Sequence, residues 1–174
     1  RMMRLDDEIL FLRQLDRSFQ RKTGLYIELK GAAFHEKEFG LSMGEELCKV
    51  LQKLEVSQDP ESCLIQCFEP NELVRLHEQG CPYKLIQLMG DRFEGNLEGI
   101  ARYAYGVGPS TNLLAKKEAG AGIESTGFVE NAKRLGLKVH PYTVRLRVQP
   151  KWSSSLDETH RVLVETLQVD GFFT

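Results

Sequence analysis

Residues 23–30 read Thr23-Gly24-Leu25-Tyr26-Ile27-Glu28-Leu29-Lys30, a short apolar run that ends in an acid and a base. Side chains alternate along a strand, so Glu28 and Lys30 share one face while Ile27 and Leu29 share the other. Charges at the C-terminal end of a buried parallel strand lie where α/β proteins build active sites. The segment is therefore interpreted as a strand of a parallel sheet. Its charged pair has two readings, a surface salt bridge or part of a site.

Helix and strand patterns alternate along the rest of the chain. Ser42-Met43-Gly44-Glu45 and Ser155-Leu156-Asp157-Glu158 are capping boxes, which open helices. The predicted strands are Leu25–Lys30, Cys63–Phe68, Tyr83–Leu88, Tyr105–Pro109, Lys138–Val144 and one beginning at Gly171. The predicted helices are Leu5–Phe19, one from Met43 through Leu54, one from Pro70 that stops at Gly80, Gly99–Tyr103, one capped by Ser125 that stops at Gly136, and one from Ser155 through Leu167.

This alternation predicts an α/β fold with a parallel sheet. A (β/α)₈ barrel has eight strands and typically about 250 residues, whereas the 174 residues here begin with a helix that no strand precedes. We expect a TIM-type (β/α)8 barrel, present as about six βα units with the first two missing. Residues 1–174 would form a single domain, the C-terminal portion of that barrel. An open doubly wound sheet is the alternative, but no glycine-rich phosphate loop follows the first strand.

Composition excludes several classes of partner. The net charge is −2 with both signs mixed, so there is no basic footprint for nucleic acid. No apolar stretch is long enough to span a bilayer, so we expect no transmembrane segment. The four cysteines are expected to be free and mostly buried thiols. The glycine-rich stretch 118–122 is interpreted as a flexible connection.

Polar residues recur near the C-terminal ends of several predicted strands. Inside a barrel they would leave unsatisfied polar groups unless they met each other, water or a ligand. Glu28 suits a hard cation such as Ca²⁺ or Mg²⁺, and Lys30 suits a phosphate oxygen. His140 could be an acid, a base or a core histidine, and Phe68 and Tyr142 could be core residues. The candidate set is Glu28, Lys30, Gln66, Phe68, Gln87, His140 and Tyr142, with Phe34 and His35 in a loop after the first strand that could border a pocket or be solvated.

A series of short motifs resembles the glycerophosphodiester phosphodiesterase family, and its longer loops and Phe34-His35 are more similar to the periplasmic type. The order and spacing match from about Leu5 to the last residue. The motifs are Gly-Leu-Tyr-Ile-Glu28-Leu-Lys30 with Phe34-His35, Ile-Gln66-Cys-Phe68-Glu-Pro, Gln87-Leu, Gly-Val-Gly108-Pro109, Val-His140-Pro141-Tyr142-Thr143-Val144-Arg145 and Val-Asp170-Gly171-Phe-Phe-Thr174.

The resemblance implies a TIM-type barrel that uses one divalent cation, Ca²⁺ or Mg²⁺, to hydrolyse glycerophosphodiesters to an alcohol and glycerol 3-phosphate. Glu28 matches one of three metal carboxylates, and Lys30 matches a lysine near the phosphate. Gln66, Phe68, Gln87, His140 and Tyr142 would bind the substrate. The resemblance implies a periplasmic or secreted location, with a cytoplasmic one left open. A homo-oligomer is also left open.

The chain departs from the family pattern at its start. The family's two catalytic histidines, in His-Arg-Gly and His-Asp motifs, and its Glu-x-Asp metal motif do not occur here. This departure coincides with the two missing strands, so we expect the site to be incomplete and the chain alone to be inactive. The alternatives are a phospholipase D-like relative, for which Trp152 is the only candidate membrane-facing aromatic, and a shortened non-catalytic binding or structural protein.

Overall fold

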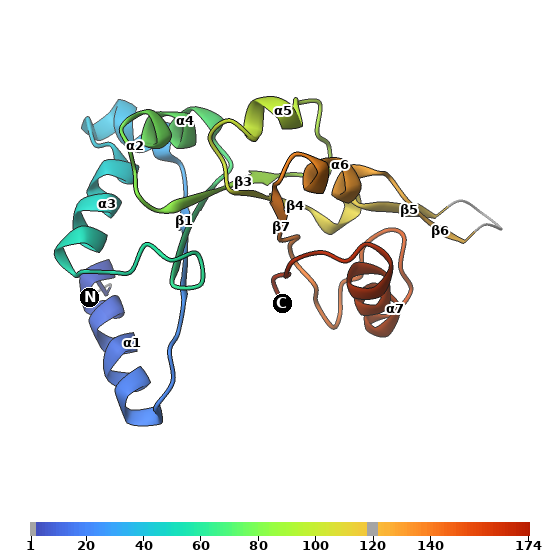
Figure 1. The fold of residues 1–174 in the computed structure, drawn as a ribbon, viewed down its shortest axis with the longest axis horizontal. Coiled ribbons are helices and arrows are strands. Elements are labelled where there is room, and N and C mark those ends of the chain that lie inside the picture. The colour runs from blue at the N-terminus through green and yellow to red at the C-terminus, as the bar shows by residue number, and fades with distance from the viewer. Residues whose placement is uncertain (1–2, 118–121) are drawn as a thin grey trace. The chain divides into compact units, whose positions relative to one another are not determined.

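The computed structural model describes residues 3–117 and 122–174. The chain divides into two compact units, which we call unit 1 (Arg1–Lys84) and unit 2 (Leu85–Thr174). Each unit combines parallel strands with helices (Figure 1). Among the described helices, none has the length and apolar character needed to cross a membrane. The expectation of one domain over residues 1–174 stays a prediction.

Unit 1 is built on two parallel strands. β1 (Leu25–Leu29) pairs with β2 (Cys63–Cys67) in a register that sets Glu28 opposite Gln66. Helix α1 (Leu5–Phe19) precedes β1, and α1 and α3 lie on one side of that strand in Figure 1. The remaining helices are α2 (Ala32–Phe39), α3 (Met43–Lys53) and α4 (Pro70–Glu78).

Local signals explain where the helices of unit 1 begin and end. Ser42 Oγ accepts a hydrogen bond from the Glu45 amide at 3.3 Å and caps α3, as its capping box predicts. Pro70 opens α4, where its missing N–H costs nothing. Gly80 then turns the chain at a φ of 73°, a left-handed conformation that glycine adopts without strain. Leu51, Ile65 and Leu73 are fully buried in the core.

Unit 2 contains three parallel strands in the order β3-β4-β7. They are β3 (Lys84–Met89), β4 (Gly106–Pro109) and β7 (Lys138–Val139). The helices are α5 (Leu97–Ile100), α6 (Phe128–Arg134) and α7 (Leu156–Arg161), with a 3₁₀ turn at Thr111–Leu113 and a π-helix at Val162–Thr166. An antiparallel hairpin of β5 (Ala115–Lys117) and β6 (Ile123–Ser125) projects from the unit (Figure 1).

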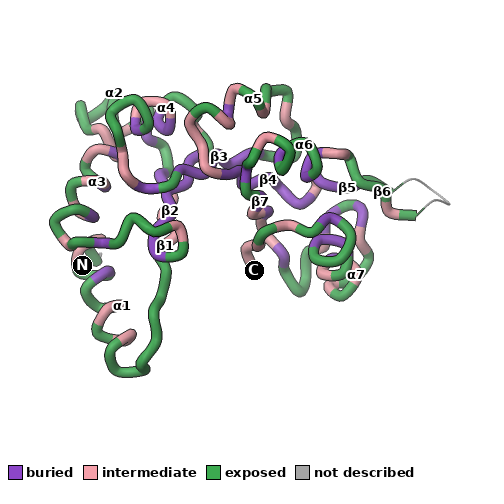
Figure 2. Tube along the Cα trace, viewed as in Figure 1, coloured by how far each residue is buried: buried purple, intermediate pink, exposed green. Residues whose placement is uncertain are grey.

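The core of unit 2 lies between its strands and its helices. Val107 of β4 and Val139 of β7 pack with Val129 and Ala132 of α6 and with Leu163, and all five side chains are buried. In Figure 2, β3 and β4 are mainly buried, while most residues of β5 and β6 are exposed. The predicted α/β fold with a parallel sheet is therefore confirmed within each unit.

Several predicted elements differ from the observed ones. The strand predicted over Lys138–Val144 ends at Val139. Pairing with β4 nevertheless continues, because the His140 and Tyr142 amides bond to the Val107 and Pro109 carbonyls and Tyr142 forms an isolated parallel bridge with Ser110. The strand predicted from Gly171 is not formed. However, the Asp170 and Phe173 amides bond to the Val139 and Pro141 carbonyls, so this segment runs beside β7.

The predictions also differ from the structure at three further elements. The segment after β1 is helix α2 instead of a loop. Helix α5 begins at Leu97 instead of Gly99, because the Asn96 side chain accepts from the Glu98 amide at 2.8 Å and caps it there. The β5–β6 hairpin was not predicted. The predicted flexible connection at 118–122 lies outside the described residues except for Gly122.

Candidate functional site

The charged pair at the end of β1 forms an ion pair. Lys30 Nζ lies 3.5 Å from Glu28 Oε2, and the Lys30 side chain is 77% exposed against 26% for Glu28. An ion pair between such exposed groups stabilises a fold by at most about 1 kcal/mol. The pair is therefore a weak structural element, and its position at a strand end is what makes it a site candidate.

Gln66 adds an unsatisfied polar group next to this pair. It is the register partner of Glu28, so both side chains project from the same face of the two strands. Gln66 is buried, with 7% of its surface exposed. Its Oε1 has no hydrogen-bond partner among the described residues. A buried amide oxygen without a partner is rare in proteins and is usually met by water, an ion or a ligand.

Helix α2 borders the same strand ends. Glu69, which follows β2, accepts a hydrogen bond from the Ala33 amide at 2.7 Å and so fastens the first turn of α2. Phe68 is exposed beside it. Phe34, His35 and Phe39 of α2 contact one another with ring centroids 5.6 to 6.1 Å apart, edge to face at Phe34 and tilted between His35 and Phe39. The prediction that His35 lies in a loop is wrong, because His35 is part of helix α2.

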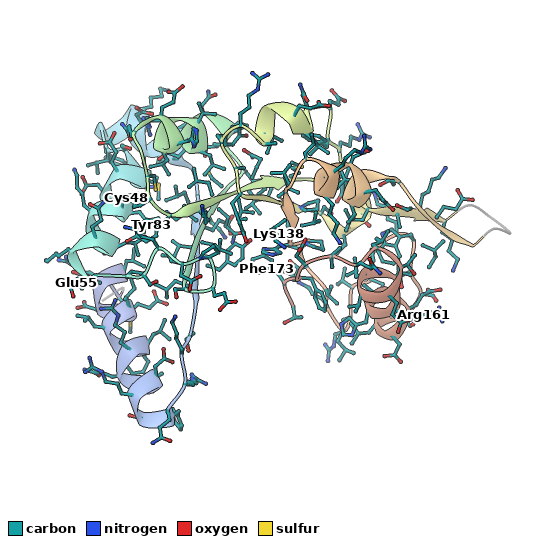
Figure 3. The ribbon with its side chains drawn as sticks, in the orientation of Figure 1. Cys48, Glu55, Tyr83, Lys138, Arg161 and Phe173 are labelled. Carbon is teal, nitrogen blue, oxygen red and sulfur yellow. The ribbon has the colours of Figure 1, made fainter. Side chains whose placement is uncertain are left out.

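His140 follows β7 in unit 2. Its backbone amide bonds to the Val107 carbonyl, which continues the β7 ladder by one residue. Burial lowers the pKa of the imidazole below its ordinary value of 6.5, and the nearby Asp170 carboxylate acts in the opposite direction. Asp170 also binds Lys138, which is labelled in Figure 3, at 2.8 Å. His140 is therefore mainly neutral at pH 7, the form that can accept a proton.

Tyr142 and Gln87, the other two predicted site residues of unit 2, form hydrogen bonds to other groups of the chain. Tyr142 Oη donates to the Met89 carbonyl at 2.8 Å. Gln87 is buried; its Nε2 donates to the Leu88 carbonyl and its Oε1 accepts from Tyr103 Oη at 2.8 Å. Gln87 shares a strand face with Val107, which packs against α6. These contacts describe a structural role, and the role of both residues in binding substrate stays a prediction.

A polar cluster at the ends of β3 and β4 was missed by sequence reasoning. Asp91 Oδ1 accepts from Ser110 Oγ at 2.5 Å and from Asn112 Nδ2 at 3.2 Å, and Lys151 Nζ lies 3.7 Å from Asp91 Oδ2. These bonds, that of Ser110 first, hold the pKa of Asp91 below its usual range. A signal was available, because Ser110 directly follows the predicted strand Tyr105–Pro109 and Asp91 lies in the loop after the predicted strand Tyr83–Leu88.

Trp152 is buried, which corrects one expectation. It is 1% exposed, and its Nε1 donates to the Thr111 carbonyl at 2.8 Å. A side chain in this position cannot insert into a membrane. The phospholipase D-like alternative therefore loses the aromatic residue on which it was based.

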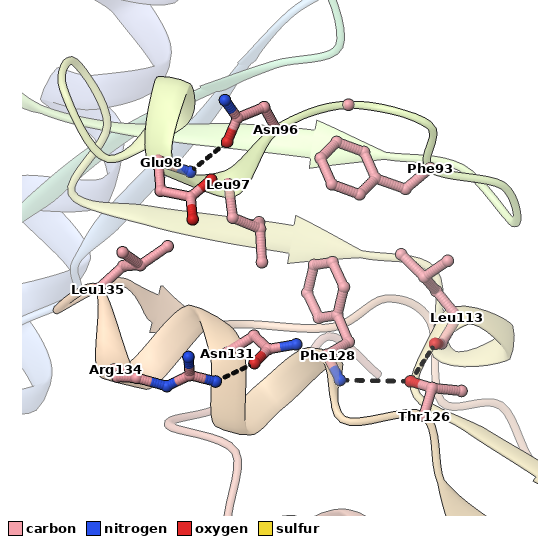
Figure 4. A pocket seen from close by; sticks show the side chains of 11 residues that line it. Phe93, Asn96, Leu97, Glu98, Leu113, Thr126, Phe128, Asn131, Arg134 and Leu135 are labelled. Carbon is pink, nitrogen blue, oxygen red and sulfur yellow. Dashed lines mark hydrogen bonds between the residues drawn. The ribbon is translucent and has the colours of Figure 1, made fainter.

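The structure also shows a groove of about 660 Å³ in unit 2, between residues 93–98 and α6 (Figure 4). Its floor is apolar, with Phe93, Leu97 and Phe128. The polar groups at its rim bond within the chain, as where Asn96 caps α5 and Arg134 bonds to Asn131. None of the predicted site residues lines this groove.

The described residues do not by themselves form a metal site. They contain no group of three or more His, Cys, Asp or Glu residues that could hold a metal ion. Glu28 and the partnerless oxygen of Gln66 are both oxygen donors, which suits Ca²⁺ or Mg²⁺, but these cations take six or more oxygen ligands in all. The donors present fit the chemistry of the cation and supply only part of its shell.

The strands and their polar C-terminal ends define an α/β protein of the kind that builds its site at the carboxyl edge of a parallel sheet. The sequence profile of the glycerophosphoryl diester phosphodiesterase family matches residues 1–174. The chain belongs to this family.

Curated relatives agree with this assignment. The chain is 29% identical to the glycerophosphodiester phosphodiesterase of Haemophilus influenzae over 100% of its own length and 56% of that protein. It is 26% identical to the Treponema pallidum glycerophosphodiester phosphodiesterase, with 94% of the chain and 54% of that protein covered. The chain thus spans about half the length of these relatives.

Solved structures show the same fold. An Oleispira antarctica phosphodiesterase in complex with the product sn-glycerol-3-phosphate matches with a TM-score of 0.65 at 16% identity, over 97% of this chain and 56% of that one. A glycerophosphoryl diester phosphodiesterase structure from Silicibacter pomeroyi matches with a TM-score of 0.64 at 19% identity, over 98% and 52%. The chain has the α/β fold of these phosphodiesterases over about half of their length.

Proposed function

We propose that a protein containing this chain hydrolyses glycerophosphodiesters to an alcohol and glycerol 3-phosphate with one divalent cation. The family match over the whole chain supports this reaction class. The observation that carries the proposal is the Glu28–Lys30 pair at the end of β1, beside the buried and partnerless Gln66 oxygen. The 174 residues alone are expected to be inactive, because the family's histidine motifs do not occur among them.

Each residue of this group has a role that its chemistry supports. The Glu28 carboxylate would be one ligand of the cation, and the cation when bound would supply positive charge to the phosphate. Lys30 would contribute a further positive charge, because its side chain is exposed and free to turn from Glu28 to a phosphate oxygen. The Gln66 oxygen would accept from a substrate hydroxyl or complete the cation's shell.

Lys30→Met tests the proposal in a longer protein that contains residues 1–174. We expect kcat/KM for glycerophosphodiesters to fall by on the order of 10², because a charge complementary to the transferred phosphoryl group is lost. Release of glycerol 3-phosphate is the measurement. Lys22→Met is the matched control. Lys22 precedes β1, so this substitution removes an equal charge at the opposite end of the same strand.

Two results would contradict the proposal. Absence of hydrolysis by the folded wild-type protein with Ca²⁺ or Mg²⁺ would exclude the reaction. Unchanged kinetics in a folded Lys30→Met variant would show that Glu28 and Lys30 are an ordinary salt bridge.

A further inference from the structure

Two cysteines of unit 1 lie in direct contact. Cys48 of α3 and Cys81, in the turn after α4, have their Sγ atoms 3.1 Å apart, and both are free thiols. A covalent disulfide has an S–S distance of about 2.05 Å, so the sulfurs need to approach by roughly 1 Å. Both side chains are partly exposed, whereas Cys63 and Cys67 are fully buried.

The surrounding contacts hold these two sulfurs together. The Gly44 amide at the start of α3 donates to Glu72 of α4 at 2.8 Å, and Gln79 Nε2 donates to Glu45 Oε1 at 2.8 Å. The Cys81 amide bonds to the Leu76 carbonyl at 2.9 Å, which fixes the turn. The segment between the two cysteines, which are 33 positions apart, is therefore already folded into a shape that brings the thiols together.

The two thiols differ in acidity. The hydrogen bond from Cys48 lowers the pKa of Cys81 to about 7, against the effect of burial, and the Tyr83 amide lowers it further. The same contact raises the pKa of Cys48, which keeps its proton. Figure 3 labels Cys48 and also Tyr83, which lies two residues after Cys81. The lowered pKa favours the Cys81 thiolate, which is the form that attacks disulfides.

We propose that Cys48 and Cys81 are a redox modification site, which forms an intramolecular disulfide by exchange with a small-molecule disulfide. The Cys81 thiolate attacks one sulfur of RS–SR, breaks that bond and releases RS⁻. Cys48 then gives up its proton and attacks Cys81 Sγ of the mixed disulfide, which releases the second RS⁻. Two protein thiols are oxidised, one small disulfide is reduced to two thiols, and the two protons end on the RS⁻ groups. The product links α3 to the turn after α4.

Peptide mapping tests this directly. The reduced chain is treated with oxidised glutathione at pH 7, quenched with acid and iodoacetamide, and cut with trypsin. Cleavage after Lys and Arg places Cys48 in residues 38–49, Cys81 in residues 76–84, and Cys63 with Cys67 in residues 54–75. We expect a linked pair of peptides 38–49 and 76–84, formed at least tenfold faster than any link to 54–75, and a return to two free peptides after dithiothreitol.

Variants separate the roles of the two cysteines. Cys48→Ser should stop the reaction at a mixed disulfide on Cys81, and Cys81→Ser should leave Cys48 slow to react. Cys67→Ser is the matched control and should leave the Cys48–Cys81 link unchanged. The rate of Cys81 modification in the wild type should rise with pH through the lowered pKa of Cys81. In Cys48→Ala, which removes the hydrogen-bond donor, the midpoint of that rise should move to higher pH.

A comparison of the folded wild-type chain with the denatured one gives a test that does not depend on the folding of any variant. In 8 M urea (a concentration chosen as strongly denaturing), the preference for the Cys48–Cys81 link should be lost, because Cys63–Cys67 closes a much shorter loop. Links between 54–75 and either other peptide as the main product of the folded chain would overturn the proposal. Equal preference for the Cys48–Cys81 link in folded and denatured chain would also overturn it.

Discussion

Glu158 makes several hydrogen bonds and an ion pair at the start of α7. It occupies the third position of α7, where its amide donates to Ser155 Oγ at 3.1 Å. Its carboxylate accepts from the Ser154 amide at 2.7 Å and from Ser154 Oγ at 2.8 Å. These bonds, the Ser154 amide first, lower the pKa of Glu158 from 4.5 to about 2, and Lys117 contributes 3.5 Å away. The ionised form is therefore the one that the fold binds.

Glu158→Gln should remove part of the pH dependence of folding. Because the pKa is depressed in the folded state, the stabilisation by Glu158 is complete above its ordinary pKa of 4.5 and disappears as pH falls to about 2. We expect the urea midpoint of the variant to lie below that of the wild type at pH 6, and the two midpoints to converge as the pH approaches 2. Glu165→Gln, in the adjacent π-helix, controls for loss of a charge. A constant difference at all pH values would contradict this assignment.

Gln87 gives a second prediction at the scale of a residue. Gln87→Leu should destabilise the chain by about 1–3 kcal/mol, because Tyr103 Oη loses its acceptor in a half-buried position. Urea unfolding of Gln87→Leu, Tyr103→Phe and the double variant measures the coupling. We expect the double variant to cost less than the sum of the singles. Additive effects would show that the 2.8 Å contact contributes nothing. A loss of kcat/KM of about tenfold without lost stability would favour the predicted substrate role.

Among the elements, α3 and α4 are joined by a buried carboxylate. Glu72 is 4% exposed, accepts from the Gly44 amide and pairs with Arg75, which also binds Glu36 of α2 at 2.5 Å. A carboxylate at a helix N-terminus meets both free N–H groups and the positive end of the helix dipole. The contact requires that residue 44 has no side chain. A Cβ there would lie 2.6 Å from Glu72 Oε1 and 2.8 Å from Leu76 Cδ1.

Gly44→Ala should therefore destabilise unit 1 in spite of the higher helix propensity of alanine. We expect a cost of about 1–3 kcal/mol from overpacking, measured by urea unfolding. Gly99→Ala in α5 is the matched control, because its Cβ would meet no atom closer than 4.0 Å. That change should be neutral or stabilising by up to about 1 kcal/mol. Equal effects at both positions would mean that α3 and α4 separate easily at this contact.

Elements that sequence reasoning placed well carry local signals. Helix α1 has the predicted bounds, and α3 and α7 begin after the predicted capping serines. Elements that it missed lack such signals. Helix α2 has Gly31 at its N-cap, with no side-chain hydrogen bond, and is fastened instead by Glu69, 36 residues away from Ala33. Short strands such as β5 and β6 have too few residues for an alternating pattern to be recognised.

At the scale of the whole molecule, the candidate metal site has too few ligands. Only one predicted carboxylate ligand, Glu28, is present, and no group of three potential ligands occurs in residues 3–117 and 122–174. Calorimetric titration of the 174-residue chain with Ca²⁺ or Mg²⁺ should therefore show no binding below millimolar metal. The extended protein of the activity assay should bind the cation, and Glu28→Gln should weaken that binding at least tenfold. Tight binding by the 174 residues would mean that the ligands lie elsewhere.

The sequence by itself determined the class of this protein: parallel βα repetition, the capped helices, and the ordered motifs that place it among glycerophosphodiester phosphodiesterases. It also pointed to Glu28, Lys30 and Gln66, because these polar residues lie near the ends of predicted strands and side-chain alternation follows from strand geometry. The register that sets Gln66 opposite Glu28 came from the structure. Only the tertiary structure decided that Gln87 bonds to Tyr103, that Trp152 is buried, that Asp91 joins Ser110, and that Cys48 touches Cys81. The physical reason is the distance along the chain between the interacting residues. Caps and periodicity act within a few residues, whereas these contacts join residues 16 to 41 positions apart and exist only once the chain has packed.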